Sequence, residues 1–219
     1  MISRSLYCRM DIPTKRGPIY WWPLIFEAMH RRAFDYTAPD QPTGIGYYYY
    51  VRKDNAMDTD FVKATFRTAW DEIYSASSQI LLSFWYHTGQ SFPLDISVEQ
   101  KEEEHLFQIF LYLNDAYLID EALEVIRSRI RLIIECAKSV YEICKPCTGE
   151  MLWSDTDISI ASFGKPLITS FFKEAKRAEQ EVNLIVQELP EKGQVYFVDP
   201  IPVPTREGWK LLPLEQPPL

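Results

Sequence analysis

The chain has 219 residues, of which 47% are hydrophobic and 14% aromatic, enough to bury a core without disulfides or a structural metal. Its 31 acidic and 23 basic residues give a net charge of −8, which argues against a broad basic face for direct nucleic-acid binding. Apolar runs fall far short of the roughly 20 residues of a transmembrane helix, and charges at Arg4, Arg9 and Asp11 interrupt any secretory signal. The sequence therefore predicts a soluble protein of the cytoplasm.

The first fifty residues predict a strand, a helix and a second strand. Residues 5–11 have the composition of a short strand, and a helix is expected over about 20–34. Pro23 suits the first turn of this helix, where its missing N–H costs nothing. Two prolines and two glycines in 37–46 predict a loop, and the tyrosine-rich segment 45–51 predicts a strand.

The middle of the chain predicts one helix followed by several strands. The helix is expected near 61–74, with Asp58 and Asp60 at its start. The segments 79–88 and 92–98 are predicted strands joined by a tight turn at 89–90. The next segment, 104–113, fits neither the helical nor the strand period cleanly, and its charged start and Asn114 at its end favour a strand over a helix.

Helical periodicity is clearest in the second half of the chain. Apolar residues at steps of three and four predict a long helix over 116–145, which Pro146 ends. The same spacing predicts a second long helix over 166–189, ended by Pro190.

The remaining segments complete a fold of the α+β class. Short strands are expected at 158–161 and 195–198, and the proline-rich tail, about 199–219, is expected to lie extended over the surface. Strands and helices do not alternate as βαβ units, and there is no glycine-rich turn. We therefore predict a single domain over 1–219, with a mainly antiparallel sheet and two long helices packed on it.

The cysteines predict structural thiols. The run Cys144-Lys145-Pro146-Cys147 resembles the C-x-P-C redox motif of thioredoxin-like proteins. A reactive cysteine of that kind lies at a helix N-terminus, whereas Cys144 would lie at a C-terminus, where the helix dipole disfavours the thiolate. No second pair of cysteines or histidines completes a zinc site. We expect buried, reduced cysteines and no bound cofactor.

Two E-x-x-H motifs are the main argument for an enzyme. Their residues are Glu27 with His30, and Glu102 with His105. On helices, Glu and His three residues apart face the same way, and two such motifs with two further glutamates are typical of di-iron carboxylate bundles. The two long helices offer Glu135 and Glu174. The interspersed strands contradict a four-helix bundle, so a metal-dependent enzyme is kept as an alternative.

Acidic and aromatic residues favour a binding protein. Residues 57–164 contain 18 acidic and 8 basic residues, whereas 1–56 have a small basic excess. A cationic partner would complement the acidic part, and aromatic runs around Trp21 and Tyr48 are typical of interface anchors. The residues expected to contact the partner are Asp58, Asp60, Glu99, Glu102, Glu103, Glu104, Trp21 and Tyr48.

In general character, this small acidic α+β chain without catalytic motifs resembles the immunity proteins that neutralise polymorphic or contact-delivered bacterial toxins. The resemblance implies a non-enzymatic inhibitor that occludes the active site of a cognate toxin. A nuclease toxin must bind phosphate and has a basic cleft, which an acidic inhibitor complements. A structural subunit of a larger complex is the other alternative, because it too would fit the aromatic runs and the proline-rich tail.

Overall fold

The structure is a computed structural model that describes residues 5–51, 59–75, 79–101, 104–119, 121–145, 148–154, 159–163, 185–188, 195–205 and 208–213. Its helices are α1 (Pro18–His30), α2 (Phe66–Ser75), α3 (Leu123–Cys144) and the short 3₁₀ helix η1 (Asp115–Tyr117). Its strands are β1 (Ser5–Pro13), β2 (Phe34–Asp35), β3 (Ile45–Val51), β4 (Thr59–Thr65), β5 (Gln79–Tyr86), β6 (Pro93–Lys101), β7 (Leu106–Asn114), β8 (Thr148–Trp153), β9 (Ser159–Phe163), β10 (Ile185–Glu188), β11 (Val195–Asp199), β12 (Ile201–Thr205) and β13 (Gly208–Leu212).

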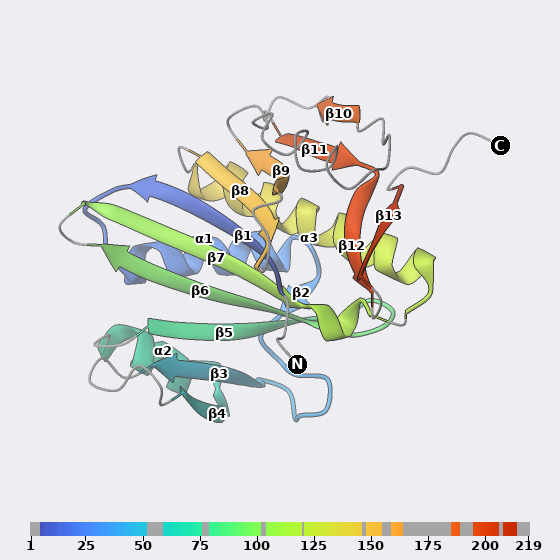
Figure 1. The fold of residues 1–219 in the computed structure, drawn as a ribbon. Helices are drawn as coiled ribbons and strands as arrows, with labels where there is room; N and C mark the ends of the chain where they lie inside the picture. Colours follow the sequence, from blue (N-terminus) through green and yellow to red (C-terminus); the bar gives the residue numbers. More distant parts are fainter. Residues whose placement is uncertain are drawn as a thin grey trace.

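One large sheet organises the molecule (Figure 1). It has 11 strands in the order β10-β11-β9-β8-β1-β7-β6-β5-β3-β4, and β2 pairs with β5 beside this path. The strand pairings described for it are antiparallel. The predicted fold class, α+β with a mainly antiparallel sheet, is therefore confirmed.

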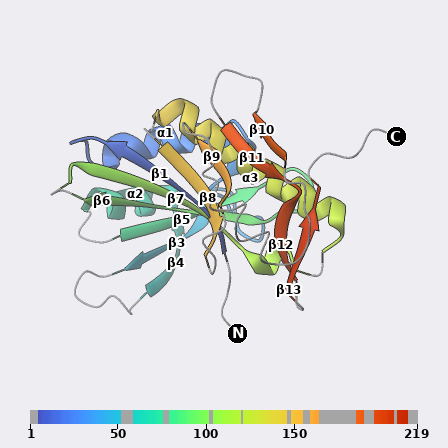
Figure 2. The ribbon, with the colours of Figure 1, turned by 45° about the horizontal axis from the view of Figure 1, so that its top comes forward.

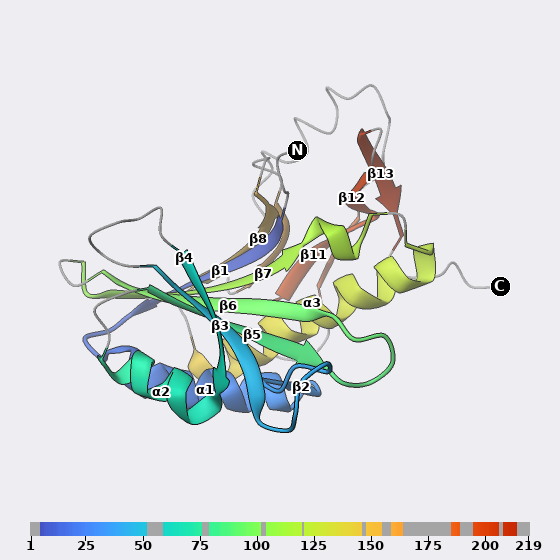
Figure 3. The same cartoon turned by 90° about the horizontal axis from the view of Figure 1, so that it is seen from below.

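The α-helices all lie on one face of this sheet, beneath it in Figure 3. Successive side chains of a strand point to opposite faces, so alternate residues meet the helices. In β1 the residues of this set are fully or almost fully buried: Leu6, Cys8, Met10 and Ile12. The core therefore lies between the sheet and the helices, as in an antiparallel sheet with one packed and one solvated face.

The apolar stripe of α3 is buried as the periodicity predicts. Ile126, Ile130 and Ile133 are 6%, 0% and 1% exposed. The helix ends at Cys144, and Lys145 follows in the left-handed conformation with φ 50°. Its start differs from the prediction, because η1 occupies 115–117 and regular α-helix begins only at Leu123.

The helix predicted over 61–74 is wrong in its first five residues, 61–65. Residues 59–65 form β4, which pairs with β3 along its whole length and brings Val62 opposite the buried Tyr48. Only 66–75 are helical, as α2. Pairing with β3 satisfies the backbone groups of 59–65, and this tertiary contact outweighs the loose helical spacing of the sequence.

The second predicted long helix, over 166–189, is wrong at its C-terminal end. Residues 185–188 form β10, where Ile185 and Val186 pair with Asp199 and Val198 of β11. The rest of the predicted helix, up to residue 184, lies outside the described residues. The described part of the chain contains one long helix, α3, and most of the second predicted helix lies outside it.

The C-terminal segment forms a hairpin, β12–β13, beside α3 (Figure 2). Ile201, Val203 and Leu212 are 0%, 1% and 1% exposed and belong to the core. Within the tail predicted as extended, the described segments 201–205 and 208–212 are strands that contribute to the core, and 206–207 and 214–219 lie outside the described residues. Strand β8, which pairs with β1, has no counterpart in the sequence prediction.

Candidate functional site

The face of the sheet opposite the α-helices is the candidate site, and we call it the open face. On the central strands, the residues of this face are those that alternate with the core residues, and the strand register places them side by side. Its large aromatic side chains are half-buried: Tyr7, Tyr47, Tyr49, Trp85, Phe110 and Tyr112. Polar and charged groups lie between them, on β1, β5, β6 and β7: Arg9, Asp11, Ser83, Asp95, Ser97, Glu99 and Gln108.

The aromatic rings of the open face are in contact with one another. Tyr112 lies beside Tyr7 and Phe110, with ring centroids 6.1 and 6.0 Å apart. Tyr47 and Trp85 form another pair, with centroids 6.3 Å apart. These distances are within the range of favourable aromatic pairs, so the rings form rigid and half-exposed apolar patches.

An ion pair on β1 is held in place from the neighbouring strand. Arg9 donates from Nε and Nη2 to the two carboxylate oxygens of Asp11, both at 3.0 Å. Gln108 Nε2 on β7 donates to the same carboxylate at 2.7 Å. Burial disfavours the charged form of Asp11, but the hydrogen bonds from Arg9 and Gln108 outweigh it and lower its pKa.

Asp95 on β6 has a different environment. Its Oδ1 accepts a hydrogen bond from Ser83 Oγ at 2.6 Å. Burial raises the pKa of Asp95, and the bond from Ser83 only partly offsets this. Two carboxylates of the open face therefore differ: Asp11 has a cationic partner, whereas the hydrogen bond to Asp95 comes from a neutral hydroxyl.

The predicted acidic contact residues that the structure describes, Asp60, Glu99 and Glu104, lie toward one end of the sheet. β3 and β6 both pair antiparallel with β5, so they run in the same direction and Val51 and Lys101 end on the same side. Glu99, near the end of β6, and Glu104, just after it, are exposed. Asp60 lies on β4 opposite Tyr50. The other predicted positions, Asp58, Glu102 and Glu103, lie outside the described residues.

The two predicted aromatic anchors are core residues instead. Trp21 is 7% exposed and stacks on Phe107, with ring centroids 5.7 Å apart. Tyr48 is 2% exposed on the helix-covered face of β3. The prediction of Trp21 and Tyr48 as exposed anchors is therefore wrong: α1 lays Trp21 on the sheet, and strand alternation sends Tyr47 and Tyr49 to the open face instead.

Several residues of the open face escaped the sequence prediction. Tyr7, Phe110 and Tyr112 belong to β1 and β7, which neighbour each other although they are about a hundred residues apart in the chain. The available signal was the alternation of Tyr7, Arg9 and Asp11 with apolar residues. That pattern marks a polar face, but it does not say which strand lies beside it.

The cysteine environment fits a structural role. Cys8, Cys136 and Cys144 are buried free thiols. Burial raises the pKa of the Cys144 thiol to about 12, so it stays protonated at neutral pH. Cys144 is the last residue of α3, as predicted, and Pro146 and Cys147 lie outside the described residues.

The E-x-x-H motifs do not form a helical metal site. His105 lies in the turn between β6 and β7 with φ 50°, so the histidine of the second motif is not on a helix, and its Glu102 lies outside the described residues. Glu27, from the first motif, pairs with Arg31 at 2.5 Å, and Glu135 pairs with Arg32 at 2.8 Å. Among the residues that the structure describes, no three His, Cys, Asp or Glu side chains gather closely enough to hold a metal ion.

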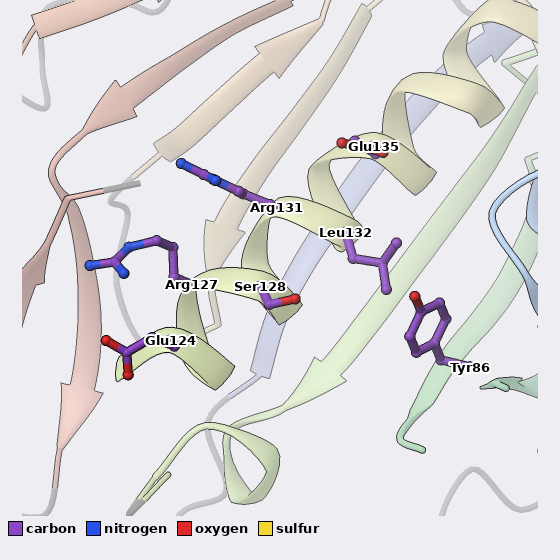
Figure 4. A pocket seen from close by; sticks show the side chains of 7 residues that line it. All are labelled: Tyr86, Glu124, Arg127, Ser128, Arg131, Leu132 and Glu135. Atoms are coloured by element: carbon purple, nitrogen blue, oxygen red, sulfur yellow. The ribbon is translucent and has the colours of Figure 1, made fainter. Parts of the chain in front are cut away.

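A hollow of about 390 Å³ lies along α3 (Figure 4). Its lining comprises Tyr86, Glu124, Arg127, Ser128, Arg131, Leu132 and Glu135. In Figure 4 the side chains of Arg127 and Arg131 point away from Tyr86 and Leu132. Arg127 Nε also donates to the carbonyl of Pro213 at 2.8 Å. The charged groups do not converge on one point, as a ligand or a reacting group would require.

Comparison with known proteins gives no match: no family model, no curated protein and no solved structure is significantly similar to this chain. Within the described residues, no helix combines the length and the apolar character needed to cross a bilayer.

Proposed function

We propose that this chain is a non-enzymatic binding protein whose open face takes a protein partner with a basic surface. The observation that carries the proposal is the composition of that face, where half-buried Tyr, Phe and Trp side chains lie among charged groups. Tyr, Trp, Phe and Arg are enriched in protein interfaces, where aromatic anchors supply much of the binding free energy.

The charge at one end of the sheet supports a cationic partner. Glu99 and Glu104 are exposed there, and the sequence between β6 and β7 adds Glu102 and Glu103. Charges at the rim of an interface mainly accelerate encounter with a partner of opposite sign. An acidic rim beside an aromatic surface thus fits fast recognition of a basic protein.

In its most specific form, the proposal is an immunity protein: a cytoplasmic bacterial inhibitor that occludes the active site of a cognate toxin. A toxin that acts on nucleic acid needs a basic cleft for phosphates, and an acidic inhibitor complements that cleft. The three buried free cysteines agree with a reducing compartment.

The direct test is co-expression with the toxin-like product of a neighbouring reading frame. We expect protection of the host cells and a stable complex on size-exclusion chromatography. The double replacement Tyr7→Ala with Tyr112→Ala should weaken the complex by about 2 kcal/mol or more, because both rings are anchors on the open face.

The matched control is Tyr20→Ala on α1, which removes an aromatic side chain that is 45% exposed in the opposite layer. This variant should bind as the wild type does. If the Tyr7/Tyr112 double variant keeps full affinity, the open face is not the interface. If the neighbouring product is neither bound nor neutralised, the immunity function itself is wrong.

A further inference from the structure

The open face contains a half-buried carboxylate surrounded by aromatic residues. Asp95 lies opposite Ser83 on one side and Tyr112 on the other. Tyr49 and Tyr117 are close enough that the charge of Asp95 contributes to their raised pKa values, after the larger effect of burial. Tyrosines from three separate segments of the chain, β3, β7 and η1, therefore lie in the neighbourhood of Asp95.

Asp95 has no Lys, Arg or His within ion-pair distance in the part of the chain that the structure describes. Arg9 and Arg129 have carboxylate partners of their own, Asp11 at 3.0 Å and Glu121 at 2.9 Å. A carboxylate removed from water without a cation is unfavourable, and a cation supplied from outside would relieve that cost. The charge and the surroundings of Asp95 therefore call for a positive group.

We infer that Asp95 and the aromatic residues around it bind an arginine side chain of the protein partner. This inference rests on the proposed function and deepens it, because it names the point where the partner's charge is held. A guanidinium group is planar, donates hydrogen bonds to a carboxylate and stacks on aromatic rings, so it fits a carboxylate among phenols. The Tyr47–Trp85 pair, on the next two strands, extends the aromatic surface for the arginine stem.

The test uses the full chain and two small probes, N-acetyl-arginine amide and its neutral isostere N-acetyl-citrulline amide. Binding is followed by NMR, from the Trp85 indole signal and from titration of the Asp95 carboxyl carbon. We expect the arginine probe to shift the indole signal and lower the pKa of Asp95, because a bound cation favours the charged carboxylate. The citrulline probe should do neither.

The variant Asp95→Asn removes the charge and keeps an oxygen that accepts from Ser83. It should weaken binding of the arginine probe by about tenfold or more, the effect of losing a charge-assisted contact. Asp71→Asn on α2 is the control, because Asp71 is an exposed carboxylate on the helix-covered side and should not matter. Equal binding of the two probes, or unchanged binding to Asp95→Asn, would overturn the inference.

The same variant separates this inference from the proposed function. If a toxin partner binds the wild type and Asp95→Asn with equal affinity, the arginine site is wrong and the proposed function stands. If the arginine probe binds as expected while no basic protein partner is recognised, the cation site stands and the proposed function is wrong.

Discussion

Arg129 is a buried side chain whose removal should strongly destabilise the fold. It lies on α3, is 6% exposed, and its guanidinium donates to three acceptors from other segments. Nη1 donates to the carbonyl of Tyr117 and, at 2.9 Å, to Glu121 Oε1. Nη2 donates to Gln90 Oε1 at 3.0 Å. One side chain thus ties the β5–β6 turn and the segment before α3 to the helix.

We expect Arg129→Met to lower the free energy of unfolding by about 3 kcal/mol. Breaking a buried ion pair by removing one partner costs about 3–5 kcal/mol. The lower end applies because the side chain of Glu121 is 34% exposed and Gln90 is exposed, so both can return to water. Methionine keeps an apolar stem in the same space, which limits the loss of packing.

Urea unfolding of the wild type and the variant measures this difference. The comparison requires that the free energy of unfolding falls with urea concentration at the same slope for both proteins. Arg127→Met is the matched control, because Arg127 lies two positions earlier on α3 and, among the described residues, its side chain makes one hydrogen bond, to the Pro213 carbonyl. It should cost less than about 1 kcal/mol. A loss below about 1 kcal/mol for Arg129→Met, which is ordinary for a surface substitution, would refute the argument.

Ile130→Ala should cost about 2–5 kcal/mol in urea unfolding, because Ile130 is fully buried and leaves a cavity; a cost near zero would contradict its place in the core. Burial raises the pKa of Asp95 in the folded protein above its ordinary value of 3.8. The folded state therefore holds the Asp95 proton more tightly than the unfolded state, so Asp95 lowers the free energy of unfolding as pH rises from 3.8 through the raised pKa, and has no such effect below pH 3.8. Asp95→Asn should therefore be more stable than the wild type at pH 7, and thermal unfolding should show this advantage vanish below pH 3.8. Cys144 should react with a thiol reagent only after denaturation, because burial raises its pKa to about 12; fast labelling of the native protein at this position would contradict this. Reversal of Glu99 and Glu104 to Lys should slow association with a basic partner and flatten its salt dependence, as stopped-flow measurements would show; an unchanged rate would leave the acidic end without a role in encounter.

The sequence by itself determined the features that depend on local pattern. Aromatic and apolar composition, together with turn and charged residues at the segment ends, predicted β3, β5, β6 and β7 close to their observed bounds. The apolar stripe of α3 was equally readable, since a helix packed on one side repeats its buried residues every three to four positions. From these elements alone the α+β class followed.

Only the tertiary structure decided the features that depend on partners far away in the chain. Residues 59–65 are a strand because β3 offers them backbone partners, and 185–188 pair with β11 although their spacing suited a helix. The sequence likewise did not decide which tyrosines of β3 face the helices. Alternation fixes which tyrosines share a side of the strand, but not which side the helices cover.

The candidate site depends on such distant contacts throughout. The chemistry of Asp95 comes from Ser83, Tyr49 and Tyr117, which the sheet brings to it from other segments. The acidic end was visible in the composition, but its place beside an aromatic open face was not. Charge and periodicity are properties of neighbouring residues in the chain, whereas desolvation and the absence of a paired cation are properties of the assembled fold.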